Sequence, residues 1–208
     1  MIFKIAALQK LMDAAYKSGR LIIGRDEYRE QGRMGYYISD SLTWTVWNDE
    51  KLMPNSLKAA IVNFLGDLPE YGEEYEVGKD KKGQKQSRIQ SDIYRLPKRM
   101  GKKGTCWTTT PIHINRGSVD YTVLQDENSL EDGINCSEIK TAHLDMIKPD
   151  EVLEDSGEVF VGGPYMTSTG SGAMWASNVC YVLIATHVGE ADEKILKHLS
   201  RININEKE

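Results

Sequence analysis

The spacing of hydrophobic and polar residues predicts an α+β protein. Apolar side chains recur every three or four residues over 5–15 and over 57–65, which is the spacing of one buried helix face. Between these helices the sequence predicts a short strand at 21–23 and a hairpin of strands at 35–39 and 42–47. Gly19 and Gly66 are suitable ends for the two helices, and a further short strand is predicted at 1–5.

The rest of the chain predicts more strand than helix. Residues 70–104 are the least core-like part, with short strands expected around Tyr75, Val77, Ile93, Tyr94 and Leu96. The following elements are expected in chain order: strands at 106–114 and 119–124, a polar loop at 126–138, a short helix near 144–154, a strand at 158–161, a Gly/Ser/Thr loop at 162–172, strands at 173–177 and 179–185, and a final helix striped by Ile195, Leu196 and Leu199. The nearly all-apolar strand at 179–185 should lie in the centre of a sheet.

Two stretches of the chain match without a gap at a separation of 138 residues. Residues 18–24 correspond to 156–162, and the match continues to the pairs Ser39/Ser177 and Asp40/Asn178. The match predicts a division into a first αβ unit at 1–70, an insert at 71–138 and a second αβ unit at 139–208. The two units would surround a mixed or mostly antiparallel sheet. The alternative is that strand–turn–strand units use Gly and Ser at similar places without duplication.

Positive charge is concentrated in the insert. The formal net charge of the chain is −5. Between 79 and 103, however, ten basic residues stand against two aspartates, which gives this basic segment +8 and leaves −13 for the remainder. An acidic body with one basic segment favours a localised contact with nucleic acid or with a partner protein. The predicted contacts are Lys79, Lys81, Lys82, Lys85, Arg88, Arg95, Lys98, Arg99, Lys102 and Lys103.

Four aromatic residues are candidate contacts in addition to the basic segment. Tyr94 and Trp107 are interleaved with it or follow it, as in proteins that hold single strands by charge and stacking. Tyr36 and Trp47 are candidates for an exposed patch that binds a partner, with packing in the core as the alternative. For the basic segment itself, the alternatives are a solvated segment, or docking onto an acidic partner or onto its own acidic run at 67–76.

The chain contains no sequence signature of catalysis. The patterns GxSxG, HExxH and GxxxxGK[ST] are absent, so no catalytic residue, cofactor or metal is predicted. Each of the three cysteines has a histidine seven residues later, but that spacing is too long for one pair to bind one zinc ion. No apolar run is long enough to span a bilayer, and an odd number of cysteines without CxxC fits a reducing cytoplasm.

The opening of the chain resembles a unit of a known family. MIFKI, AALQKLMDAAYKSG and YYISDSLTWTVWND give the order strand, helix and paired strands, with an aspartate in the turn Ile38-Ser39-Asp40. This resembles the βαβββ unit that opens DNA sliding clamps, which are acidic proteins assembled from repeated units. The resemblance implies contact with DNA. Clamps place their basic residues on helices facing DNA, whereas here they lie in the insert.

Together these observations predict a non-enzymatic, cytoplasmic binding protein with the general character of a phage or mobile-element protein. The expected partner is nucleic acid or a nucleic-acid-binding protein complex, and not a membrane. One such function is inhibition of a host nuclease, as by an anti-CRISPR protein, in the host cytoplasm. The alternatives are a small-ligand or nucleotide-binding protein that uses the loop at 162–172 to hold an anion, and an enzyme with a non-standard site. The oligomeric state stays open.

Overall fold

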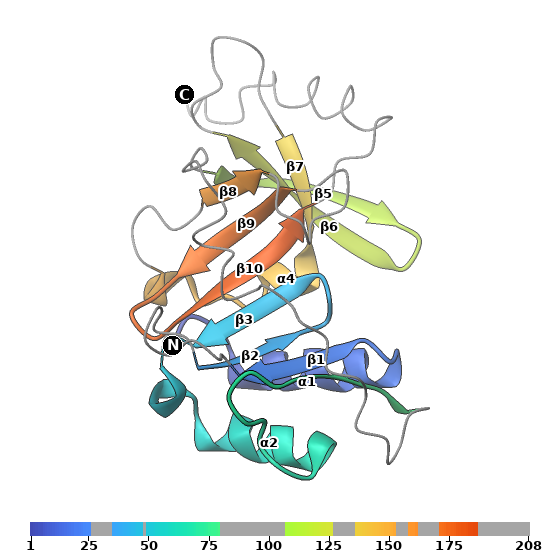
Figure 1. The fold of residues 1–208 in the computed structure, drawn as a ribbon. Helices are drawn as coiled ribbons and strands as arrows, with labels where there is room; N and C mark the ends of the chain where they lie inside the picture. Colours follow the sequence, from blue (N-terminus) through green and yellow to red (C-terminus); the bar gives the residue numbers. More distant parts are fainter. Residues whose placement is uncertain are drawn as a thin grey trace, which may run out of the picture. The chain divides into compact units, whose positions relative to one another are not determined.

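The fold combines two mostly antiparallel sheets with few helices, which confirms the predicted α+β class (Figure 1). The computed structural model describes residues 1–25, 35–47, 49–79, 107–126, 136–152, 158–161 and 171–186. One sheet has seven strands in the order β4-β1-β2-β3-β10-β9-β8, and the other has three in the order β5-β6-β7. The chain forms two compact units. The first contains residues 1–99, 145–153 and 175–183, and the second contains the remainder.

The first helix of the first unit, α1 (Ile5–Lys17), follows the predicted apolar stripe. Leu8, Met12 and Ala15 are buried. The helix ends where Gly19 adopts a φ of 70°, and the backbone N–H of Gly19 donates to the carbonyl of Tyr16. Glycine reaches this left-handed conformation without strain, so the predicted stop is confirmed.

Four strands of the seven-stranded sheet lie in the first unit in antiparallel pairs. The predicted hairpin is confirmed as β2 (Tyr36–Ser39) and β3 (Thr43–Trp47), and the predicted third strand as β1 (Leu21–Arg25). Strand β4 (Glu74–Val77) pairs with β1 and is the last strand of this sheet on that side.

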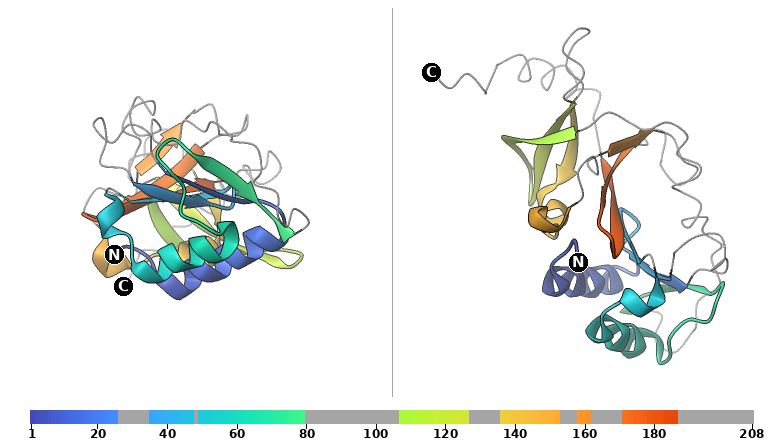
Figure 2. Two further views of the ribbon diagram at one scale, coloured as in Figure 1. Left: turned by 60° about the horizontal axis from the view of Figure 1, so that its bottom comes forward. Right: turned by 90° about the vertical axis from the view of Figure 1, so that its left-hand side faces the viewer.

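The second helix, α2 (Asn55–Leu65), packs beside α1 (Figure 2). The short 3-10 helix η1 (Glu50–Leu52) precedes it. Leu57 and Ile61 of α2 are buried, and the rings of Tyr16 and Phe64 meet at 5.0 Å between the two helices. The predicted helix end is confirmed, because Gly66 follows α2 with a φ of 92°.

A second set of strands completes the large sheet: β8 (Glu158–Val161), β9 (Ser171–Ala176) and β10 (Cys180–Thr186). Strand β10 lies between β3 and β9 and is almost entirely buried, which confirms its predicted central place. The strand order therefore runs β1-β2-β3 and then, in reverse, β10-β9-β8. The division of the chain at 70 and 138 stays a prediction.

The turns that close the β2–β3 and β9–β10 hairpins use the same hydrogen bonds. The Asp40 carboxylate accepts from the backbone N–H groups of residues 42 and 43, and the Ser177 hydroxyl oxygen accepts from those of residues 179 and 180. In both turns the backbone N–H of the first residue also donates to the carbonyl three residues later. Asp40 thus corresponds in structure to Ser177, one residue away from the pairing in the sequence match.

The three-stranded sheet belongs to the second unit. Its strands are β5 (Trp107–Arg116), β6 (Val119–Asp126) and β7 (Cys136–Lys140), all antiparallel. The predicted strands β5 and β6 are confirmed, with Gly117 at a φ of 67° in their turn and a register shift between Thr109 and His113. The polar loop predicted at 126–138 was wrong at its end, because Ser137 and Glu138 are buried within β7.

The helix predicted near 144–154 was also wrong. The chain instead forms the four-residue α4 (Thr141–Leu144) and the 3-10 helix η4 (Pro149–Glu151). Between them, Ile147 pairs with Phe3 as an isolated bridge, and Met146 and Ile147 are buried. Proline disfavours helix in the residue before it, and the bridge draws this segment into extended backbone. The strand predicted at 1–5 is reduced to this bridge, since α1 begins at Ile5.

Candidate binding surfaces

The basic segment is described only at its start. Lys79 is exposed and directly follows β4 and Gly78. The other predicted contacts lie outside the described residues: Lys81, Lys82, Lys85, Arg88, Arg95, Lys98, Arg99, Lys102, Lys103 and the aromatic Tyr94. Trp107 begins β5. Of the loop predicted at 162–172, only Ser171 and Gly172 are described, as part of β9. The final helix predicted around Ile195 also lies outside the described residues.

Tyr36 and Trp47 do not lie on the surface, so the prediction that these two rings are exposed was wrong. Only 4% of Tyr36 and none of Trp47 is exposed. The Trp47 ring meets Phe3 edge-on with a centroid distance of 5.4 Å. Both side chains pack in the core, which was the alternative drawn from the sequence. The two strands of this hairpin carry buried residues on both of their faces.

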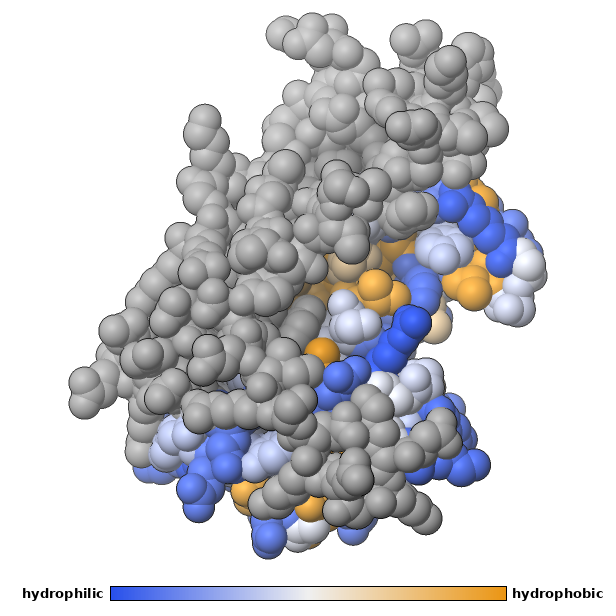
Figure 3. Space-filling view, turned by 45° about the vertical axis from the view of Figure 1, so that its right-hand side comes forward, coloured by the Kyte–Doolittle hydropathy of each residue, from blue (hydrophilic) through white to orange (hydrophobic). Residues whose placement is uncertain are grey.

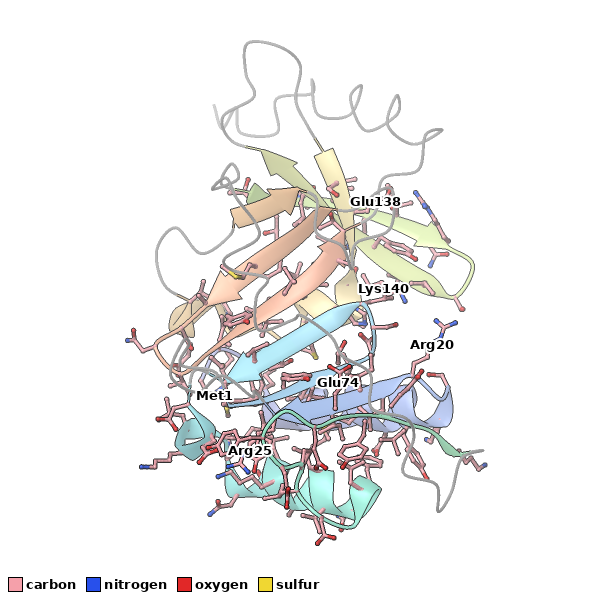
Figure 4. The ribbon with its side chains drawn as sticks, in the orientation of Figure 1. Met1, Arg20, Arg25, Glu74, Glu138 and Lys140 are labelled. Atoms are coloured by element: carbon pink, nitrogen blue, oxygen red, sulfur yellow. The ribbon has the colours of Figure 1, made fainter. Side chains whose placement is uncertain are left out.

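Arg25, labelled in Figure 4, ends β1 and lies near the rings of two tyrosines. Its guanidinium carbon lies 3.8 Å from the ring centroid of Tyr71 and 5.1 Å from that of Tyr36. The guanidinium donates to the Glu50 carboxylate, with Nε at 3.0 Å, and forms an ion pair with it. The Tyr71 hydroxyl donates to the same carboxylate at 2.7 Å. Four side chains from β1, β2, η1 and the loop before β4 therefore form one fixed cluster.

Electrostatics in the cluster follow from this geometry. Burial lowers the pKa of Arg25, but its hydrogen bond to Glu50 and the neighbouring charges outweigh burial, so the pKa is raised. Burial raises the pKa of Tyr36, and the Arg25 charge offsets only part of that rise. Arg25 therefore holds its proton more tightly than a free arginine, and Tyr36 holds its phenol proton more tightly than a free tyrosine.

The buried carboxylate of Glu74, in β4, lies on the face of the sheet opposite to Arg25 and Tyr36. Tyr37 donates a 2.7 Å hydrogen bond from its hydroxyl to Glu74, and 2% of Glu74 is exposed (Figure 4). The Tyr37 ring lies over the backbone of Gly24, where any Cβ would overlap it. Gly24 is thus required by a close approach of the ring to the backbone.

A second buried carboxylate, Glu138, belongs to the three-stranded sheet. It accepts a 2.7 Å hydrogen bond from Arg116, whose guanidinium carbon lies 5.4 Å from the centroid of the Tyr121 ring. On the other face of the sheet the Thr122 hydroxyl meets that of Thr141 at 2.9 Å. The ion pair therefore joins a buried carboxylate of β7 to a partly exposed guanidinium of β5.

The cysteines and histidines form no metal site among the residues that the structure describes. No group of three or more His, Cys, Asp or Glu side chains there is arranged to hold a metal ion. Cys180 is buried, and burial raises its pKa. Its spacing partner in the sequence, His187, lies outside the described residues, whereas His113 is exposed on β5 and His143 lies in α4.

Few large hydrophobic side chains are exposed in the described part of the chain. They are Leu52, Val62 and Tyr71, with 44%, 37% and 40% of each exposed. In the view of Figure 3, hydrophobic residues gather in a few areas bordered by hydrophilic ones.

Among the described helices, none is long and apolar enough to cross a membrane. No protein-family model matches the chain, and comparisons with curated proteins and with solved structures found no match either.

Sequence patterns did not indicate the Arg25 cluster. Its members come from positions 25, 36, 50 and 71 and share neither a motif nor a period. The local signals in the sequence were Pro69 and Gly72, which predict a loop around Tyr71. They do not indicate which residues the Tyr71 ring contacts.

Proposed function

We propose that the chain is a non-enzymatic binding protein of a phage or mobile element, acting in the host cytoplasm. It engages DNA, or a protein complex that handles DNA, through residues 79–103. The observation that carries this proposal is the separation of charge: +8 in 25 residues against −13 in the remainder. Segregated charge of this kind steers a polyanion to one place on an otherwise repelling surface.

The position of the segment in the chain supports the proposal. It begins at the exposed Lys79, just after an edge strand of the large sheet, and the next described element is β5. Most of the buried residues in the described cores are apolar, for example in α1 and β10, as expected of a scaffold. The finer proposal, inhibition of a host nuclease as by an anti-CRISPR protein, combines this contact with the clamp-like opening of the chain.

Oligonucleotide binding at two salt concentrations tests the direct contact with DNA. The test variant carries glutamate at Lys98, Arg99, Lys102 and Lys103. If each contacts a phosphate, the slope of log affinity against log salt should fall by roughly 3 for single strands, at about 0.7 per lost contact. The matched control reverses Lys4, Lys10, Lys17 and Lys51, which lie on the described surface outside the segment and give the same change in net charge.

Each result of this experiment has a definite reading. Loss of binding in the test variant alone supports contact through the segment. Absence of binding by the wild type refutes direct DNA binding, and equal losses in both variants refute contact through the segment. In that case, addition of the protein to a nuclease cleavage reaction tests the protein partner. A nucleotide-dependent rise in melting temperature would instead favour the alternative, a nucleotide site in the loop at 162–172.

A further inference from the structure

Tyr71 and Leu52 are exposed hydrophobic residues on two segments that are linked through Glu50. They are the two most exposed large hydrophobic residues of the described chain, at 40% and 44%. Tyr71 is fixed by its stacking on Arg25 and by its hydroxyl hydrogen bond to Glu50, and Leu52 belongs to the same short η1 helix as Glu50. We call Tyr71, Leu52, Arg25 and Glu50 the Tyr71 surface.

The composition of this surface is that of a binding hot spot. Tyrosine and arginine are enriched among the residues that dominate the energetics of protein interfaces, and tyrosine offers a large contact area with few rotatable bonds. Here the Arg25 guanidinium lies 3.8 Å from the Tyr71 centroid and is already paired with Glu50. A partner that covers the exposed part of the ring therefore meets a preordered side chain and loses little conformational entropy.

The charges around the Tyr71 surface select the class of partner. The loop that carries Tyr71 also carries Asp67, Glu70 and Glu73, and Asp49 directly precedes η1, against one nearby lysine in η1. Arg25 is neutralised by Glu50. Phosphates would be repelled by these carboxylates, whereas lysine and arginine side chains would be attracted to them.

We propose that the Tyr71 surface binds a basic protein surface, one that presents arginine or lysine around an apolar side chain. This inference rests on the protein-binding form of the proposed function, because proteins that handle DNA carry basic faces of this kind. The chain would then have two contacts of opposite sign. The basic segment would face nucleic acid, and the acidic Tyr71 surface would face the protein that holds the nucleic acid.

The test uses a short fluorescent peptide of alternating arginine and leucine as the probe, with glutamate in place of arginine in the control peptide. Affinity is measured for the wild type and for three variants: Leu52→Ser, Tyr71→Ala and Val62→Ser. Val62 is the matched control, since 37% of it is exposed but it lies in α2. The first two changes should weaken binding of the basic peptide by about tenfold or more, as for hot-spot residues, and Val62→Ser by less than about twofold.

Two further measurements separate this inference from other causes of lost binding. Tyr71→Phe keeps the ring and should bind the peptide within about twofold of the wild type, as expected if contact area carries the affinity. Oligonucleotide binding should be unchanged in Leu52→Ser, so failure of the Tyr71 surface is distinguishable from failure of the basic segment. The inference is overturned if the wild type does not prefer the basic peptide, if Val62→Ser is equally weakened, or if Leu52→Ser binds normally.

Discussion

Replacing Gly24 by alanine should destabilise the protein, because the Tyr37 ring lies against the Gly24 backbone. An alanine Cβ would overlap Cζ and the hydroxyl oxygen of Tyr37. The ring has little room to turn away, since 3% of Tyr37 is exposed and its hydroxyl is bound to Glu74 at 2.7 Å. The mutant must therefore either keep the overlap or give up the hydrogen bond.

Both outcomes have a similar cost. Overpacking a well-packed core costs about 1–3 kcal/mol, and losing a hydrogen bond to a charged group costs about 1.5–3 kcal/mol. Since the mutant incurs one or the other, we expect a loss of about 2 kcal/mol in the free energy of unfolding. For a chain of this length that corresponds to a fall of roughly 4–8 °C in melting temperature.

The assay is urea unfolding of Gly24→Ala in the wild type and in a Tyr37→Leu background. Leucine removes the ring, so alanine at 24 should then be neutral or stabilising by roughly 0.5 kcal/mol, as is usual for glycine-to-alanine changes inside a strand. The sign of the alanine effect thus reverses between the two backgrounds. A cost below about 0.5 kcal/mol in the wild type, or an equal cost in both backgrounds, would refute the reasoning.

Three further predictions concern other described residues. Cys180, buried and with a raised pKa, should react with a thiol reagent at neutral pH much more slowly in the native protein than in urea; equal rates would contradict its burial. Because the pKa of Tyr36 is raised, the unfolded chain loses this phenol proton first, so stability should fall as pH rises above about 10; Tyr36→Phe should reduce that fall, as measured by urea unfolding. Asp40→Ala and Ser177→Ala should each cost about 1 kcal/mol in thermal unfolding, since each removes a side-chain acceptor for two backbone N–H groups of a turn.

Local patterns in the sequence predicted most described elements, because they reflect local physics. The apolar stripe of Leu8, Met12 and Ala15 predicts α1 without knowledge of what the helix packs against. A glycine marks the C-terminal end of α1 and another that of α2. The wrong secondary-structure predictions lie where a segment pairs with backbone that is distant in the sequence. Residues 144–154 carry apolar residues at helical spacing, but Ile147 instead pairs with Phe3, and the sequence does not encode that contact locally.

The candidate surfaces were less predictable than the fold. The basic segment is a matter of composition and is evident from the sequence. Whether Tyr36 and Trp47 face solvent depends on what covers each face of their sheet, and alternation within a strand does not say this when both faces are buried. The Tyr71 surface depends on η1 and the loop before β4 meeting at Arg25 of β1, which only tertiary structure defines.

The register shift in β5 has a consequence for solubility. β5 is an edge strand of the three-stranded sheet, and an exposed edge is a template for pairing with strands of other molecules. Pro111 lies within the shift between Thr109 and His113 and has no N–H to donate. An incoming strand would meet an interrupted ladder there, so this edge is protected against the strand-to-strand aggregation that a regular ten-residue strand would invite.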